Sequence, residues 1–101
     1  MIFSFHLSPA AEADISRIIL FYSEISAQIV KKIEAELQHL KGRLEIFPLS
    51  CPLYSKRVRR ATLHIVPYNL YYEFVDGCIT VAAVLPQRFS YESIGERLLE
   101  S

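Results

Sequence analysis

With 101 residues, the chain is long enough for one domain, and we expect a single domain over residues 1–101. Its apolar content of 51% and charged content of 22% argue against a disordered or fibrous chain. Eleven basic residues balance eleven acidic ones, which argues against a protein that holds nucleic acid by its overall charge.

The sequence contains no pattern typical of secretion or membrane insertion. Residues 1–6 lack the basic stretch of a signal peptide, and the most apolar run, 15–22, is too short to span a bilayer. We therefore expect a cytoplasmic protein with no membrane partner. Cys51 and Cys78 form no CxxC pair, so we interpret both as free thiols that fill space, and we expect no metal or other cofactor.

The N-terminal half predicts a strand followed by two helices. Residues 2–7 alternate between apolar and polar side chains, as in a half-buried strand. Ser8 followed by Pro9 is typical of a helix start. Two apolar stripes at helical spacing, separated by a break at residues 23–26, predict an antiparallel helical hairpin. The first stripe comprises Ile15, Ile18, Ile19, Tyr22 and Ile25, and the second comprises Ile29, Ile33, Leu37, Leu40 and Leu44.

The C-terminal half predicts a β-meander. Prolines in residues 47–52 indicate a loop, after which the apolar pattern changes to a period of two. We expect strands at residues 57–65, 69–75 and 78–85. The Asp-Gly pair at residues 76–77 is typical of a tight hairpin turn between the last two strands.

These elements together predict an α+β fold. Ser90 is a candidate cap for a short final helix, whose apolar side comprises Tyr91, Ile94 and Leu98. The fold then consists of an N-terminal strand, a two-helix antiparallel hairpin, a three-stranded antiparallel meander and a short C-terminal helix, with both long helices on one face of the sheet. Strand alternation predicts that Phe3, Phe5, Leu7, Leu63, Ile65, Leu70, Tyr72, Phe74, Ile79, Val81 and Leu85 face the helices. It places His6, Arg60, Thr62, His64, Asn69, Tyr71, Glu73 and Thr80 on an uncovered polar face, together with Arg88.

The uncovered face has two interpretations. Arginines in a sheet cavity can bind phosphate or stabilise the charge that develops during phosphodiester cleavage, with a tyrosine or histidine transferring protons. The simpler interpretation is an ordinary polar sheet face on which Arg60 and Glu73 form a surface ion pair. The residues alone favour the simpler one. The three histidines share no metal-ligand spacing, and no glycine-rich nucleotide loop is present.

Four segments in order resemble the RelE/ParE superfamily of bacterial toxins. They are residues 7–15, with the pattern Ser-Pro-x-Ala-x-x-Asp, then 58–61, 67–72 and 79–88. The resemblance implies a toxin of a type II toxin–antitoxin module, of the kind that arrests growth and stabilises plasmids. It implies a cognate antitoxin as partner, through which the toxin could form oligomers. The target is either DNA gyrase, as in ParE-like members, or messenger RNA on the ribosome, as in RelE-like members.

Two departures from the pattern favour the ParE-like branch. Many relatives have a His-x-Arg-Arg-like stretch where this chain has residues 86–89, Pro-Gln-Arg-Phe, and Glu73 occupies a position that is often basic. We therefore expect a gyrase inhibitor, with a RelE-like ribonuclease and a degenerate non-toxic relative as alternatives. The candidate target-binding residues are Lys56, Arg57, Arg59, Arg60 and Arg88, and for a ribonuclease the candidate catalytic residues are Arg60, Arg88 and Tyr91.

Overall fold

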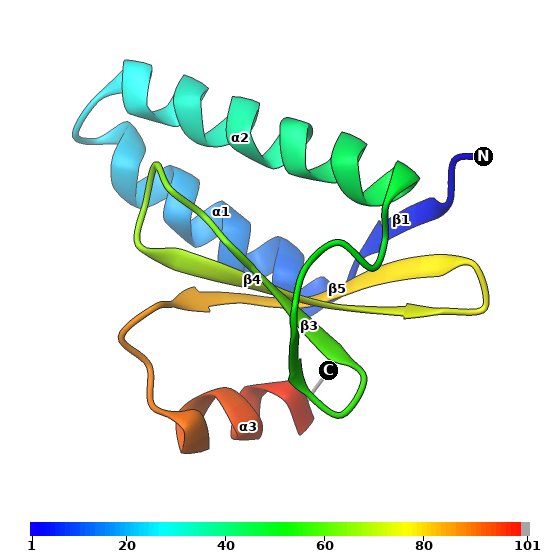
Figure 1. The fold of residues 1–101 in the computed structure, drawn as a ribbon. Coiled ribbons are helices and arrows are strands. Elements are labelled where there is room, and N and C mark those ends of the chain that lie inside the picture. Colours follow the sequence, from blue (N-terminus) through cyan, green and yellow to red (C-terminus); the bar gives the residue numbers. More distant parts are fainter. Residues whose placement is uncertain (100–101) are drawn as a thin grey trace.

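The helical hairpin forms as its stripes predict. The structure is a computed structural model that describes residues 1–99. Helix α1 (Pro9–Ser23) begins after Ser8, whose hydroxyl accepts a hydrogen bond from the Ala11 amide, and α2 (Ala27–Ile46) begins after Ser26, whose hydroxyl accepts from the Ile29 amide. Both helices lie on the same side of the sheet (Figure 1).

Five strands form one sheet in the order β1-β5-β4-β3-β2. The strands are β1 (Ser4–Leu7), β2 (Leu53–Ser55), β3 (Val58–Thr62), β4 (Tyr68–Val75) and β5 (Cys78–Pro86). Strand β1 pairs in parallel with β5, and the other neighbours are antiparallel. The predicted Asp-Gly hairpin is confirmed, since Asp76 and Gly77 both have positive φ angles, of 52° and 74°. The predicted α+β class and the order of the predicted elements are also confirmed.

A bulge in β5 changes which side chains face the helices. Tyr71 pairs with Ala83 while Tyr72 pairs with Val81, so Ala82 is an extra residue on β5. Side chains beyond the bulge therefore lie on opposite faces from those that simple alternation predicts. Leu85, which was predicted to face α1 and α2, instead belongs to an apolar cluster on the other side of the sheet.

The second face of the sheet is covered, not open. Helix α3 (Tyr91–Leu99) lies across it, opposite α1 and α2 (Figure 1). Ile94 of α3 packs with Tyr71, Ala83 and Leu85, and all four side chains are buried. The prediction of an uncovered polar face was therefore wrong for its central part, because the bulge supplies the apolar side chains that a short amphipathic helix can cover.

Three further details differ from the sequence prediction. Strand β2 was not predicted, because residues 47–52 contain two prolines and the strand after them has only three residues. Strand β3 ends at Thr62, and Ile65, predicted to be in the core, is 43% exposed. Ile25, predicted in the first helical stripe, lies beyond the end of α1 and is also exposed.

Candidate functional site beneath the C-terminal helix

Three tyrosines and one arginine gather between the sheet and α3. The ring of Tyr54, on β2, lies 5.1 Å from the ring of Tyr71 and 5.7 Å from the ring of Tyr91, measured between centroids. The guanidinium carbon of Arg60, on β3, lies 5.2 Å from the centroid of the Tyr54 ring. Such a stack of a guanidinium on an aromatic ring is a cation–π contact. The fold thus brings Arg60 and Tyr91 to the same tyrosine.

The buried carboxylate of Asp14 holds α3 in this position. Only 2% of its side chain is exposed. Its Oδ2 accepts hydrogen bonds from Arg97 of α3, at 2.8 Å, and from the amide of Val84 beside the bulge, at 3.0 Å. Arg17 also donates to its Oδ1. One aspartate therefore connects α1, the bulged strand and α3, and charge-assisted hydrogen bonds of this kind are the strong ones.

Tyr54 holds its proton more firmly than an ordinary tyrosine does. Burial raises the pKa of Tyr54 above its ordinary value, neighbouring Tyr71 and Tyr91 raise it further, and Arg60 opposes them. The hydroxyl of Tyr71 is buried without a hydrogen-bond partner among the described residues. At neutral pH, Tyr54 is consequently a neutral phenol beside the fixed positive charge of Arg60.

The remaining predicted site residues lie in the turn after β2, on β3 and in the loop before α3. Lys56 and Arg57 form the exposed turn between β2 and β3, and Lys56 has a positive φ of 50°. Arg59 donates to the carbonyl oxygens of Leu49, at 3.3 Å, and Cys51, at 2.7 Å, which ties the preceding loop to the strand. Arg88 is exposed in the loop between β5 and α3.

The predicted alternative, a surface ion pair between Arg60 and Glu73, does not form. Within residues 1–99, the ion pairs join Asp14 to Arg17 and to Arg97, and Lys41 to Glu45. Arg60 instead rests on the ring of Tyr54.

Sequence reasoning missed Tyr54 and the role of Asp14. Tyr54 lies in the three-residue strand that the prolines concealed. Asp14 entered the sequence analysis only as the aspartate of the Ser-Pro-x-Ala-x-x-Asp pattern. Its place one turn before Ile18, on the apolar side of the predicted helix, was an available signal for a buried carboxylate.

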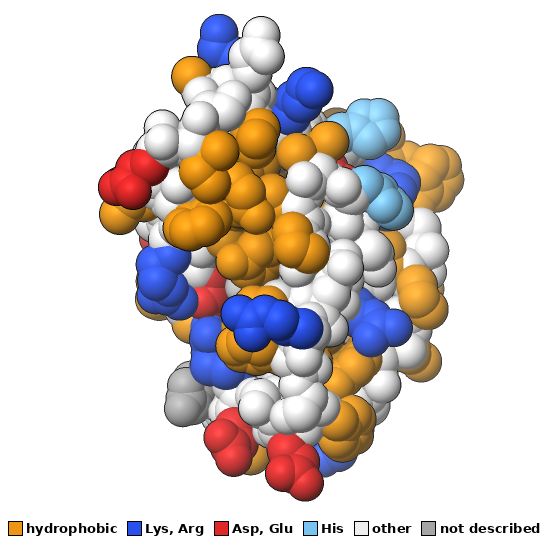
Figure 2. Space-filling model, turned by 90° about the vertical axis from the view of Figure 1, so that its left-hand side faces the viewer, with side chains coloured by type: hydrophobic (Ala, Val, Ile, Leu, Met, Phe, Trp, Pro, Cys, Tyr) orange, Lys and Arg blue, Asp and Glu red, His pale blue; other side chains and the backbone are white. Residues whose placement is uncertain are grey.

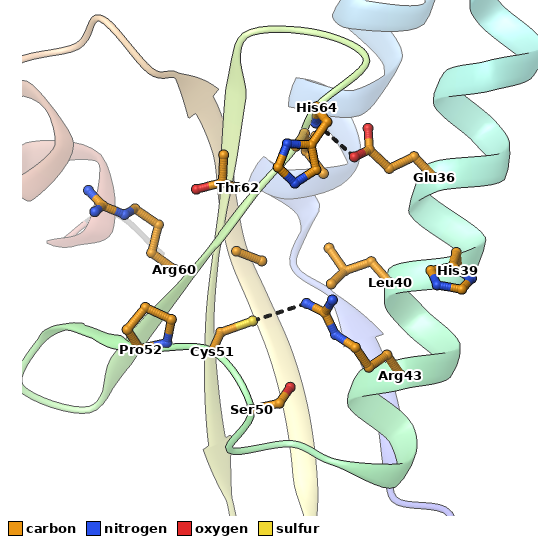
Figure 3. A pocket seen from close by; sticks show the side chains of 12 residues that line it. Glu36, His39, Leu40, Arg43, Ser50, Cys51, Pro52, Arg60, Thr62 and His64 are labelled. Atoms are coloured by element: carbon orange, nitrogen blue, oxygen red, sulfur yellow. Dashed lines mark hydrogen bonds between the residues drawn. The ribbon is translucent and has the colours of Figure 1, made fainter.

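The surface has two hollows near the elements that carry the cluster. One of about 480 Å³ lies between α2 and β3 (Figure 3). Another of about 270 Å³ is lined by Phe21, Tyr68, Pro86 and Phe89 with Arg17 and Arg97 at its border. Seen from the left-hand side of Figure 1, the surface carries a group of apolar side chains with basic side chains below it (Figure 2).

We searched residues 1–99 for groups of metal ligands and for membrane-spanning helices. In residues 1–99, no group of three or more His, Cys, Asp or Glu side chains lies close enough to hold a metal ion. None of the described helices is long and apolar enough to cross a bilayer.

A protein-family profile, described as the ParE toxin of type II toxin–antitoxin system, parDE, matches residues 5–91. The chain belongs to this ParE toxin family. It is therefore the toxin component of a type II toxin–antitoxin system, and membership of the family implies a cognate antitoxin. None of the curated proteins matches the chain in sequence.

Solved structures show that this ParE-family toxin shares its fold with both branches of the superfamily. A chain of the chromosomal ParDE toxin–antitoxin system from Pseudomonas aeruginosa is 18% identical, with a TM-score of 0.70 over 84% of this chain and 96% of that chain. Escherichia coli toxin RelE, as a double arginine-to-alanine variant in the free state, is 13% identical, with a TM-score of 0.67 over 99% of this chain and 98% of that chain. The predicted RelE/ParE-like fold is confirmed.

Proposed function

We propose that this ParE-family toxin arrests bacterial growth in the cytoplasm by binding and inhibiting DNA gyrase, and that its cognate antitoxin neutralises it. The observation that carries the proposal is the cluster beneath α3, in which a fixed cation, Arg60, lies over the ring of Tyr54, which in turn contacts Tyr71 and Tyr91. This arrangement suits the recognition of a partner surface, since arginine and tyrosine are enriched where proteins bind tightly.

The same cluster supports binding over catalysis. Cleavage of RNA needs a group that accepts a proton near neutral pH. The groups whose charges affect Tyr54 are Tyr71, Tyr91 and Arg60, and burial together with the other tyrosines raises the pKa of Tyr54. A phenol with a raised pKa is a poor proton acceptor at pH 7.

We propose that the target contacts the exposed basic side chains around the cluster. Lys56 and Arg57 project from the turn that follows Tyr54, and Arg88 precedes the helix that carries Tyr91. Arg60 lies between these groups in the chain and forms no ion pair among the described residues. Arg59 contributes indirectly, by holding residues 49–51 against β3.

Growth measurements test this proposal. Expression without antitoxin should stop growth and cause gyrase-linked DNA breaks to accumulate, and Arg60→Ala should abolish both effects. Loss of the Arg60–Tyr54 contact costs about 0.5–1 kcal/mol of stability, so the variant should still fold. Arg17→Ala, which removes another exposed arginine, is the matched control and should remain toxic. An Arg60→Ala variant as toxic as the parent would contradict the proposed role of the cluster.

A RelE-like ribonuclease is the second candidate, because the fold brings Arg60 and Tyr91 together at Tyr54. In a translating extract, toeprinting would reveal cleavage of messenger RNA directly. On the gyrase proposal no cuts appear. Codon-positioned cuts that disappear in Arg88→Ala or Tyr91→Phe would establish the ribonuclease instead.

Co-expression with the neighbouring reading frame tests the partner. We expect a stable complex on size-exclusion chromatography and a higher melting temperature for the toxin, because a ligand that binds only the folded state stabilises it. A soluble toxin that never elutes with that product would refute the assignment of that partner.

A further inference from the structure

The hollow of about 270 Å³ lies where α1, the end of β5 and α3 meet. One side of it belongs to α1, and the other side belongs to α3 and to the loop before that helix. Residues 84–86, at the end of β5 beyond the bulge, lie between them. In Figure 1 the end of β5 and the loop that follows it lie on the left, below α1. A molecule in this hollow therefore contacts elements from both faces of the sheet.

Most of the lining is apolar. Ile18, Val84 and Leu85 form its buried part, and each is no more than 5% exposed. The aromatic side chains in the lining are Phe21, Tyr68 and Phe89. Ligand pockets are lined mainly by apolar and aromatic side chains, and pockets for drug-sized molecules begin at about 300 Å³. The hollow therefore fits a smaller molecule, about the size of one substituted ring.

Asp14 brings a negative charge to the lining, but it has no acceptor position left for a ligand. Its Oδ1 accepts hydrogen bonds from Arg17 and Arg97, and its Oδ2 accepts from Arg97 and from the amide of Val84. An ionised carboxylate offers about four acceptor positions. A cation in the hollow would thus meet two guanidinium groups and no open carboxylate position. The charged groups of the lining disfavour a cation.

Arg17, in contrast, keeps donors open at the border of the hollow. Its side chain is 66% exposed, and its Nη2 donates to Oδ1 of Asp14. A guanidinium has five N–H donors in a plane, arranged so that pairs of them bind both oxygens of a carboxylate. Among residues 1–99, Asp14 is the acceptor that this guanidinium contacts, and the hydrogen bond uses one donor. One pair of donors on Arg17 is therefore available to an anion.

We propose that this hollow binds a small aromatic carboxylate, whose ring lies against Phe21 and Phe89 and whose carboxylate pairs with Arg17. The lining stabilises the ring by removing its apolar surface from water and by contact between aromatic rings. The open donors of Arg17 select an anion over a neutral molecule of the same shape. This site goes beyond the proposed function, which assigns no ligand to the hollow, and it does not depend on the identity of the toxin's target.

Such a ligand controls how easily α3 opens. The hollow is complete only while α3 and the loop before it lie in place beside α1, because both contribute to its lining. A ligand that binds only this closed arrangement stabilises it further as the ligand concentration rises. The ligand therefore makes the cluster beneath α3 less accessible to a partner.

A titration of the full chain with phenylacetate, followed by amide NMR, tests the proposal. The amide signals of Leu85 and Phe89 should shift and saturate at millimolar concentration, the affinity expected of a ligand this small. At a concentration about ten times the dissociation constant, the amides of α3 should exchange with solvent about tenfold more slowly. Shifts that do not saturate would overturn the site, and unchanged exchange in α3 would overturn its control of the helix.

Two matched ligands separate the contributions of charge and ring. Phenylacetamide has the shape of phenylacetate without its charge, and acetate has the charge without the ring. At equal ionic strength, both should bind at least about tenfold more weakly than phenylacetate, because each lacks one of the two contacts. Equal binding of phenylacetamide and phenylacetate would show that the hollow does not recognise a carboxylate, and it would overturn the proposal.

Variants of the lining sharpen the experiment. Arg17→Gln should weaken phenylacetate binding by about tenfold or more and leave phenylacetamide binding unchanged, since it removes only the charged partner. Arg57→Gln, at an exposed arginine outside the hollow, is the matched control and should bind like the parent. Phe21→Ser, at a phenylalanine that is 60% exposed, should weaken both ligands, because it removes an aromatic wall. Equal effects of Arg17→Gln and Arg57→Gln would overturn the role of Arg17.

The same chemistry occurs at the C-terminus of a protein chain that ends in phenylalanine. Acetyl-Ala-Phe with a free carboxylate distinguishes this source from a small molecule. It should bind no more tightly than phenylacetate, because the hollow has room for little more than the ring and its carboxylate. Binding at least about tenfold tighter than that of phenylacetate would assign the hollow to the C-terminus of a protein and would overturn the proposal.

Discussion

The two faces of the sheet are built in different ways. On the face covered by α1 and α2, a continuous core of buried aliphatic side chains includes Ile33, Leu44 and Val81, each no more than 2% exposed. On the face covered by α3, the buried cluster among residues 1–99 comprises Tyr71, Ala83, Leu85 and Ile94. The smaller face is supplemented by polar contacts, through Asp14 at one side and Arg60 at the other.

The two faces therefore contribute differently to the stability of the fold and to its proposed function. The face with the larger buried apolar area contributes most of the hydrophobic free energy of folding. The face beneath α3 holds Tyr54 and Tyr71 beside Arg60, the arginine proposed to contact the target, and it is covered by a helix of nine residues. A short helix with a small buried area is the part of a structure expected to open at the lowest free energy.

The largest effect is expected from Leu44→Ala, on the α1 and α2 face. The Leu44 side chain is fully buried, and its truncation should lower the free energy of unfolding by about 4 kcal/mol. Urea denaturation followed by circular dichroism measures the change. Leu20→Ala, at a leucine that is 66% exposed, is the control and should change the free energy by less than about 0.5 kcal/mol. Equal effects would show that α2 does not cover the main core.

Asp14→Ala should destabilise the protein by about 3 kcal/mol, because it removes the buried carboxylate that accepts hydrogen bonds from the Val84 amide and from Arg97. The matched control is Arg17→Ala, whose side chain is 66% exposed and whose ion pair contributes at most about 1 kcal/mol. Urea denaturation of both variants gives the comparison. If the two were equally stable, Asp14 would not be the residue that joins the two faces.

Ile94→Ala should cost about 2 kcal/mol, at the low end for a buried isoleucine, because α3 can detach without opening the main core. Hydrogen exchange distinguishes this local opening from global destabilisation. The amides of α3 should exchange faster by a larger factor than those of α2. A uniform acceleration across both helices would mean that the two faces unfold as one unit.

The smallest effect concerns Tyr54 and high pH. Its folded-state pKa lies above the ordinary 10.0, so the unfolded chain releases this proton first. The contribution of the protonated Tyr54 phenol to the free energy of unfolding is therefore fully present below about pH 10, and it is lost as pH rises through the folded-state pKa. Tyr54→Phe should therefore flatten the decline in unfolding free energy between about pH 9 and pH 11. An unchanged slope would indicate that Tyr54 titrates as it does in the unfolded chain.

The sequence predicted the face covered by α1 and α2 better than the face covered by α3. The helical stripes, the cap at Ser8 and the Asp-Gly turn act within a few residues, so local patterns were sufficient to place α1, α2 and the hairpin. Of the candidate site residues, Arg60 and Tyr91 come together in the structure. Their common contact, Tyr54, was missed because a three-residue strand after a proline has no periodic signal.

By itself, the sequence determined the class of the fold, the order of its predicted elements and the family resemblance, because these depend on local periodicity and on short motifs. Only the tertiary structure decided which side of the sheet the residues of β5 beyond the bulge face. The extra residue, Ala82, has no local signature, since a bulge depends on hydrogen bonds from distant parts of the chain. Here Ser8 donates to the Ala82 carbonyl and Asp14 accepts from Val84, across more than 65 residues. These long-range contacts turn the expected open face into the covered site beneath α3.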